Sequence, residues 1–341
     1  MQMRDDLGIT TKLENGKAYL EFALPEKIGR LLSALQIEIW EGAEGERLVF
    51  HGEYSSEEAD SMTALLLRPH LWDGMRDPYV YLVKAQGRFR SVEYGEKMGG
   101  MEKEEKLDPA EDITGEVEMY WRQELTIYDV RVVEKKGILL NEKEFLPHEV
   151  VYRLPPQISD AGTRVEQVRR DLERLVRMGV NVIRLEGTGS GAERQNCYEV
   201  RAFYRLCRRG GFLTGDLWIR PENLPVYRGL PGETTCQALL AADGRTLTER
   251  YYYYQAKWSS EPVLYPVLST LHRQENGLLS LTIYSNQKKV VLYVDGLLFL
   301  FQTAASGDPE FIFEDIPVEK LPLHLAVEAG NLSISLTVTK L

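Results

Sequence analysis

The sequence predicts a multidomain, β-rich protein in which two β-sandwiches flank a reduced α/β centre. Three features of the 341-residue chain carry this prediction. Short runs of alternating apolar and polar residues fill both ends of the chain, and the middle changes to the 3.6-residue period of helices. The length also allows two or three domains, because single cores stop growing before it. We expect domains at residues 1–135, 136–258 and 259–341.

The first domain is predicted to be an antiparallel sandwich. Its alternating runs are KAYLEFAL (17–24), SALQIEIW (33–40), MTALLLRP (62–69), DPYVYLVK (77–84) and VEMYWRQELTIYDV (117–130). Strands of this length separated by polar turns are typical of immunoglobulin-like sandwiches. Residues 95–115 are rich in charge and glycine and predict a charged surface loop.

The middle domain shows strands alternating with helices. Thr163 and Glu166 have the T-x-x-E spacing of a capping box, which predicts that a helix begins at Thr163. An apolar stripe follows, and Gly179 is expected to end the helix before a buried strand at 180–185. The stripe consists of Val165, Val168, Leu172, Leu175 and Val176.

A second unit of the same kind comes next. Val200, Phe203, Tyr204 and Cys207 recur at helical spacing, and two glycines at 210 and 211 end that helix before a strand at 212–219. Strands that alternate with helices predict parallel pairing with right-handed crossovers.

The last domain is predicted to be a second immunoglobulin-like sandwich. Seven short strand-like runs follow residue 263, and Asp295-Gly296 is a favoured hairpin turn between two of them.

Composition limits the possible partners. A formal charge of −11 argues against nucleic acid and against an anionic membrane surface. We find neither an apolar leader nor a run of about 18 apolar residues, so we expect a cytoplasmic protein. Three cysteines and five scattered histidines predict no metal site. Residues 187–192, GTGSGA, lack the spacing of a nucleotide-binding loop, and no cofactor is expected.

Several segments, in collinear order, resemble the glycoside hydrolase family 2 enzymes, the β-galactosidase and β-glucuronidase group. The matches are Trp72 with the Asp-Pro-Tyr-x-Tyr of 77–81, Arg131 with Leu140, Asn141 and Lys143, the run 162–185 with Asp171, Gly179, Asn181 and Arg184, FYRLC at 203–207, YYYYQAKW at 251–258, and SNQKKVVLYVDG at 285–296. Glu142 stands where the family has glycine, and Arg208 replaces an aspartate.

The resemblance implies a (β/α)8 barrel between the sandwiches, but the chain is too short for one. Gly137 to Ala256 is only 120 residues, whereas a complete barrel needs about 250 and rarely fewer than about 200. We therefore expect a partial barrel that lacks its middle.

The resemblance also implies two catalytic carboxylates, and the missing middle would remove them. The sole Asn-Glu dipeptide, Asn141-Glu142, is interpreted as a structural turn. Glu149, Glu186 and Asp216 lie on or just after predicted parallel strands, where α/β folds place ligands. They are the catalytic candidates, although charged residues are so abundant that solvated or structural roles are favoured.

Candidates for carbohydrate binding are Arg153, Arg184 and Trp218. Arg184 could equally be a strand-end arginine paired with a nearby acid. The aromatic run 251–254 could stack on sugar rings, although helical spacing favours packing against the sheet.

The function expected from these observations is that of a family 2-like pseudoenzyme, which binds carbohydrate or a protein partner without catalysis. One alternative is a glycosidase that hydrolyses O-glycosyl bonds with a non-standard carboxylate pair. Another is a structural subunit that completes another chain, which an exposed strand edge or a large apolar patch would favour.

Overall fold

A computed structural model of the chain describes residues 7–92, 113–154, 161–186, 197–214, 224–229, 238–305 and 307–340. The chain divides into two compact units, Met1–Phe145 and Leu146–Leu341. No described helix is long and apolar enough to cross a membrane.

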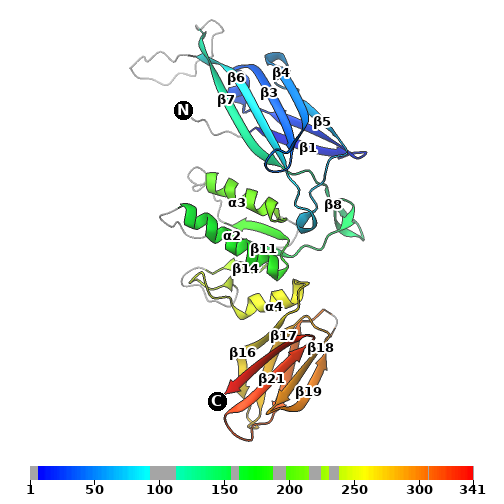
Figure 1. Cartoon of the computed structure of the whole chain (residues 1–341), viewed down its shortest axis with the longest axis vertical. Coiled ribbons are helices and arrows are strands. Elements are labelled where there is room, and N and C mark those ends of the chain that lie inside the picture. Colours follow the sequence, from blue (N-terminus) through cyan, green and yellow to red (C-terminus); the bar gives the residue numbers. More distant parts are fainter. Residues whose placement is uncertain are drawn as a thin grey trace, which may run out of the picture. The chain divides into compact units, whose positions relative to one another are not determined.

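The first unit contains a sandwich of two antiparallel sheets (Figure 1). The three-stranded sheet has the order β1-β2-β5, with bounds Gly8–Glu14, Lys17–Ala23 and Thr63–Leu67. The four-stranded sheet has the order β4-β3-β6-β7, with bounds Arg47–Ser55, Leu32–Glu41, Tyr81–Val92 and Ile113–Leu125. Alternate residues of β2, namely Ala18, Leu20 and Phe22, are buried between the sheets, which confirms the predicted sandwich.

The loop predicted at residues 95–115 falls between β6 and β7. Residues 95–112 lie outside the described part, and β7 already begins at Ile113. The unit also holds α1 (Glu26–Gly29) and the 3-10 turns η1 (Ser56–Glu58) and η2 (Gly74–Arg76).

A small antiparallel sheet ends the first unit. It consists of β8 (Val130–Val133), β9 (Gly137–Leu140) and β10 (Lys143–Glu144). Asn141 and Glu142 have φ angles of 50° and 66° and form the two-residue turn from β9 to β10, so the interpretation of this dipeptide as a structural turn is confirmed. The Asn141 amide accepts from Asp129 N at 3.0 Å and donates to Trp72 O at 2.9 Å.

The second unit begins with a parallel sheet and three helices. The strands are β11 (Glu149–Arg153), β12 (Val182–Glu186), β13 (Leu213–Thr214), β14 (Val226–Arg228) and β15 (Ala238–Leu240), and the helices are α2 (Ala161–Met178), α3 (Cys197–Arg209) and α4 (Glu249–Trp258). The sheet order is β13-β12-β11-β14-β15, and every neighbouring pair is parallel. The predicted helix–strand alternation is therefore present.

Two expectations about this sheet need revision. Helix α2 begins at Ala161, so Thr163 lies inside its first turn and is not the N-cap. The partial barrel is not confirmed. β11, β12 and β13 follow each other side by side as in a barrel, but β14 lies on the other side of β11, so the strand order reverses there. Of the strand predicted at 212–219, Leu213 and Thr214 are in β13 and residues 215–219 are outside the described part.

A second sandwich follows, with the same strand order as the first. One sheet is β16-β17-β20, with bounds Leu264–Arg273, Leu279–Ser285 and Glu310–Ile316. The other is β19-β18-β21-β22, with bounds Leu297–Thr303, Lys289–Val294, Leu323–Ala329 and Leu332–Val338. Asp295 and Gly296, with φ angles of 47° and 82°, form the predicted turn between β18 and β19.

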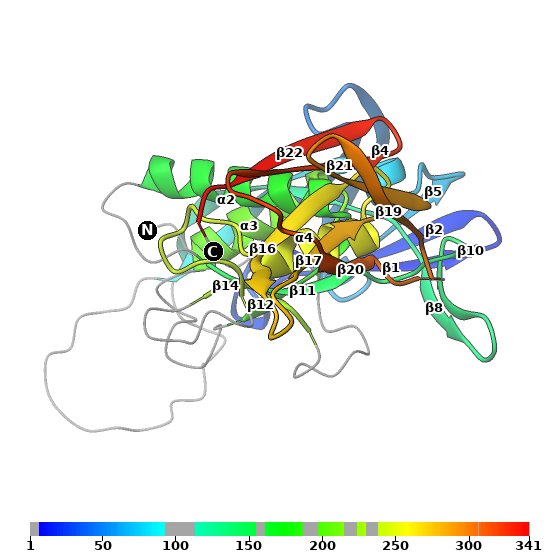
Figure 2. The same cartoon turned by 90° about the horizontal axis from the view of Figure 1, so that it is seen from below.

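Helix α4 joins the parallel sheet to this sandwich and lies beside β16 and β17 (Figure 2). The Tyr252 ring stacks on Tyr265 with centroids 3.8 Å apart, and Tyr253 meets Tyr284 edge-on. Tyr251 is buried, and its hydroxyl donates to Arg174 O at 2.9 Å. The aromatic run therefore packs within the unit, as helical spacing favoured.

Candidate functional site

Charged residues lie side by side at the carboxyl ends of three strands of the parallel sheet. β11 ends at Arg153, β12 at Glu186 and β14 at Arg228, and the register pairs Arg153 with Glu186. Open parallel sheets bind ligands outside the carboxyl ends of strands, at the point where the strand order reverses. Here the order reverses between β11 and β14, so this edge is the candidate site.

The residues of β11 and β12 that were predicted as catalytic or carbohydrate-binding candidates share one face of the sheet. Val150, Tyr152 and Ile183 belong to the core that the sheet forms with α2 and α3. Because side chains alternate along a strand, the odd-numbered residues of β11 and the even-numbered residues of β12 point to the opposite face. Glu149, Arg153, Arg184 and Glu186 are on that face.

These four residues form two ion pairs across the strands. Arg184 Nε donates to Glu149 Oε1 at 2.8 Å, and the Glu149 side chain is fully buried. Arg153 donates from Nε to Glu186 Oε2 and from Nη2 to Glu186 Oε1 at 3.4 Å. Arg153 Nη1 also donates to Arg228 O at 3.4 Å. Each glutamate is thus neutralised by an arginine of the neighbouring strand.

The register keeps the two glutamates apart. Glu149 is paired with Val182, and Arg153 with Glu186. The Cα positions of Glu149 and Glu186 are therefore offset by four residue steps along the strands, about 13 Å at roughly 3.3 Å per step. The other two candidates, Asp216 and Trp218, lie outside the described residues.

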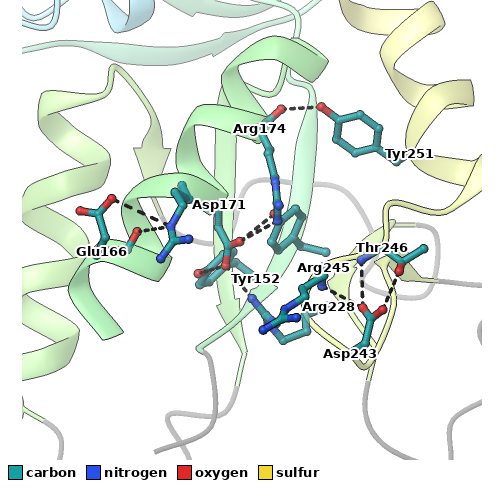
Figure 3. Close-up of polar contacts among 11 residues, drawn as sticks. Tyr152, Glu166, Asp171, Arg174, Arg228, Asp243, Arg245, Thr246 and Tyr251 are labelled. Atoms are coloured by element: carbon teal, nitrogen blue, oxygen red, sulfur yellow. Dashed lines mark hydrogen bonds and ion pairs between the residues drawn. The ribbon is translucent and has the colours of Figure 1, made fainter. Parts of the chain in front are cut away.

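Asp171 on α2 is the centre of a buried network behind this edge (Figure 3). It accepts hydrogen bonds from Tyr152 Oη at 2.9 Å, Tyr227 Oη at 3.0 Å and Arg228 Nη2 at 2.7 Å. Arg174 Nη1 lies 3.6 Å from Asp171 Oδ1. The network ties α2 to the ends of β11 and β14.

Burial and charge keep the two phenols of the network protonated. Burial, reinforced by the Asp171 carboxylate, raises the pKa of Tyr152 well above its usual value. The same two causes raise the pKa of Tyr227. Both tyrosines therefore act as hydrogen-bond donors to Asp171.

One feature of the sequence marks Asp171 as a buried acid. The residue sits between Val168 and Leu175 on the apolar stripe of its helix. An acid on a buried helix face must be paired, because an isolated buried charge is costly.

A tight loop covers Arg228. Asp243 accepts hydrogen bonds from Thr246 Oγ1 and from the backbone N of Thr246 and Arg245, which hold the pKa of Asp243 at about 2. Gly244, with φ +69°, lies so close that a Cβ there would be 2.7 Å from Arg228 Nη1. The loop therefore fixes the guanidinium against Asp171.

Metal binding finds no support in the described residues, which hold no cluster of three or more His, Cys, Asp or Glu side chains fit for an ion. Cys207 is buried in α3, and burial raises the pKa of its thiol, so the thiolate form is disfavoured. Cys197 lies at the start of α3, and Cys236 is outside the described part.

Comparison with solved structures identifies the fold. A β-glucuronidase from Faecalibacterium prausnitzii L2-6, described as FMN-binding, matches with a TM-score of 0.66 and 13% identity over 98% of this chain and 74% of that chain. A β-glycosidase from Bacteroides vulgatus matches with a TM-score of 0.62 and 12% identity, over 98% and 64%.

A glycosyl hydrolase family 2 member from Bacteroides cellulosilyticus DSM 14838 gives a TM-score of 0.60 and 13% identity, over 98% and 63%. No protein-family model and no curated protein matches the sequence. The resemblance to family 2 glycoside hydrolases is thus confirmed at the level of the fold, and the chain spans between 63% and 74% of the length of these three structures.

Proposed function

We propose that the chain is a non-catalytic protein of family 2 architecture that binds carbohydrate at the carboxyl edge of its parallel sheet. One observation carries the proposal. Both described catalytic candidates, Glu149 and Glu186, are held in ion pairs with arginines of the neighbouring strand, and their backbone positions are offset by four residues along the two strands. A retaining mechanism requires an acid/base and a nucleophile that face each other across about 5 Å.

The chemistry of the edge supports a sugar as the ligand. The side chain of Glu186 is 47% exposed and that of Arg153 is 19% exposed, so the pair can offer hydrogen-bond donors and acceptors to a ligand. Sugar hydroxyls need both kinds of group, and planar guanidinium and carboxylate groups hold them in fixed directions. Several proteins with this fold are described as β-glucuronidases or β-glycosidases, which makes carbohydrate the first class to test.

The catalytic part of the proposal is tested with aryl-glycosides. The full chain at high concentration should release no aryl alcohol above the level of its Glu186→Gln and Glu149→Gln variants. Turnover that either substitution abolishes would instead show a glycosidase with a non-standard carboxylate pair.

The binding part is tested by titrating oligosaccharides from a glycan panel into the chain by calorimetry. Glu186→Gln and Arg153→Gln should each weaken binding at least about tenfold, because each removes a charged group at the edge. Glu166→Gln is the matched control, since Glu166 lies on α2 and its ion pairs of 3.8 and 3.9 Å are exposed. Binding that survives both edge substitutions, or no binding to any glycan, would refute a sugar site at this edge.

A further inference from the structure

The first sandwich has a polar, hollowed face on the outside of its four-stranded sheet. Odd-numbered residues of β3 and β6, such as Leu35 and Val83, belong to the core. The even-numbered residues of β3, β6 and β7 therefore point outward and form the outer face. Two neighbouring hollows of about 590 Å³ and about 340 Å³ lie on this face, and Gln36 and Gln86 line both. Small-molecule sites have volumes of roughly 300–1,000 Å³, so each hollow has the size of a ligand site.

The register of the sheet arranges the polar side chains of the outer face in rows. Gln36 on β3 is paired with Gln86 on β6, which is paired in turn with Tyr120 on β7. In the next row, Glu38 is paired with Lys84. β3 and β6 are the two central strands, each hydrogen-bonded on both sides. The rows therefore lie on a rigid part of the sheet, which holds a binding site more precisely than a loop does.

Tyr120 gives the outer face a fixed aromatic ring. The residue is 66% exposed, yet its hydroxyl accepts a hydrogen bond from Gln86 Nε2 at 3.1 Å and donates one to Glu118 Oε2 at 2.6 Å. Because the ring is already held in place, a ligand that packs against it has little side-chain freedom to remove. An aromatic ring beside amide groups suits a pyranose, which has an apolar C–H face and a rim of hydroxyls.

The charges of the outer face favour a neutral ligand. The residues that line the two hollows include four glutamates and, as basic groups, Lys84, Arg88 and Arg122. The two signs are nearly balanced, so the face does not present the single-sign surface that attracts a polyanion or a polycation. The amides of Gln36 and Gln86 both donate and accept hydrogen bonds, as sugar hydroxyls do. The backbone groups of β3 and β6 are already paired within the sheet, so a peptide strand could not add to it here.

We propose that the outer face of this sheet binds a neutral oligosaccharide. Tyr120 packs against one pyranose ring, and Gln36 and Gln86 form hydrogen bonds with its hydroxyls. The site belongs to the first unit, whereas the strand-end site of Arg153 and Glu186 belongs to the second. Either site can therefore fail without the other.

Calorimetric titration of the full chain tests the proposal. The probes are the neutral hexasaccharides of β-1,4-glucan, β-1,3-glucan, β-1,4-xylan and β-1,4-mannan, with hexagalacturonic acid as the charged comparison. At least one neutral probe should bind, and more tightly than the acid. Tyr120→Ala should weaken that binding about tenfold, because it removes the aromatic contact. Tyr19→Ala is the matched control, because Tyr19 is 40% exposed on β2 of the other sheet.

Two further variants separate ring contact, folding and the second unit. Tyr120→Phe keeps the ring and should bind more tightly than Tyr120→Ala, and all three tyrosine variants should melt close to the wild type because both positions are exposed. In a Glu186→Gln background, Tyr120→Ala should cause the same loss as in the wild-type chain.

The outcomes that would overturn the proposal are distinct. They are no binding of any neutral probe, binding that Tyr120→Ala leaves intact, equal weakening by Tyr19→Ala, and tighter binding of the acid. Binding that Glu186→Gln abolishes and Tyr120→Ala does not change would support the strand-end site and overturn this one. Binding that survives Glu186→Gln but not Tyr120→Ala would support the outer face alone.

Discussion

At the scale of single residues, Gly179 ends helix α2 in a backbone conformation and a space that only glycine fits. Its φ is +86°, and a Cβ would lie 2.4 Å from Trp258 O and 2.6 Å from Trp258 C. A left-handed conformation costs an L-residue about 1–2 kcal/mol, and a clash with backbone atoms adds about 1–3 kcal/mol. We expect Gly179→Ala to lower the free energy of unfolding by more than about 2 kcal/mol in urea denaturation.

Gly277 provides the matched control for Gly179. It has the same φ of +86°, but a Cβ would meet only the Arg273 guanidinium, at 3.7 Å. Gly277→Ala should therefore cost only the conformational part, about 1–2 kcal/mol. Equal losses in the two variants would show that the contact with Trp258 is unimportant.

His148 should make the second unit less stable in mild acid. Its ring stacks on Trp258 with centroids 5.2 Å apart, and Nδ1 donates to Gly179 O at 2.8 Å. Burial lowers the pKa of His148 below its usual value. The folded state then binds fewer protons than the unfolded state, so stability is fully present above about pH 6.5 and falls as the pH drops through the folded pKa.

Denaturation of the wild-type chain and His148→Gln at several pH values checks this expectation. The wild type should lose stability as the pH falls below about 6.5, and the variant should lose less over the same interval. A loss of the same size in both proteins would assign the pH dependence to other groups.

The sequence located the charged residues of the candidate site but not their pairing. Glu149, Arg153, Arg184 and Glu186 were found because they lie on predicted strands. Which arginine meets which glutamate depends on the register of β11 against β12, and a single sequence does not contain that register. Asp171 was named only as a family match, because the strands that supply Tyr152 and Tyr227 approach it from distant parts of the chain.

At the scale of elements, Asp171 holds helix α2 against the parallel sheet through a buried charge pair. The side chains of Asp171 and Arg228 are 1% and 6% exposed, and their closest atoms are 2.7 Å apart. Asp171→Asn keeps the shape but leaves the Arg228 charge buried without a counter-charge. We expect a loss of about 3–5 kcal/mol in the free energy of unfolding, measured by urea denaturation.

The exposed acid Glu166, on the same helix, gives the comparison. Its oxygens lie 3.8 and 3.9 Å from Arg169 and Arg170 near the surface. Glu166→Gln should change stability by less than about 0.5 kcal/mol. If the two variants were destabilised alike, the Asp171 network could not be what holds α2 in place.

Periodicity predicted most of the helices and strands of the chain. The differences between the predicted and observed elements are local. The helix after Thr163 was predicted, but it starts two residues earlier, at Ala161. The T-x-x-E spacing therefore lies within the first turns of the helix and does not mark its N-cap. The strand at 180–185 corresponds to β12. The aromatic residues of α4 stack on β16 and β17, a contact across more than ten residues that the pattern of a single helix does not show.

At the scale of the whole molecule, the sequence predicted the succession of sandwich, α/β centre and sandwich. Chain length predicted that a complete barrel does not fit between Gly137 and Ala256, and the described strands of this segment form one five-stranded parallel sheet. Length says nothing about strand order, and here β14 follows β13 in the chain but pairs with β11. The reversal places the candidate site at these strand ends, and it also positions Arg153 beside Arg228.

The two units have separate hydrophobic cores and should unfold in separate transitions. Ile37 is fully buried in the core of the first unit, whereas Asp171 is buried in the second. Each unit has the size of an independent folding domain. In calorimetry we expect two transitions. Ile37→Ala should lower the melting temperature of the first unit, by the equivalent of about 3 kcal/mol in free energy. Asp171→Asn should lower the melting temperature of the second unit.

The double variant distinguishes independent units from coupled ones. If the units are independent, its two transitions should each shift as in the corresponding single variant, because distant sites without shared partners add. A single transition that both substitutions lower would mean that the units unfold together. In that case the cost of Ile37→Ala would also appear in the part of the chain that carries Arg153 and Glu186, and the glycan binding proposed for this edge would weaken with it near the melting temperature.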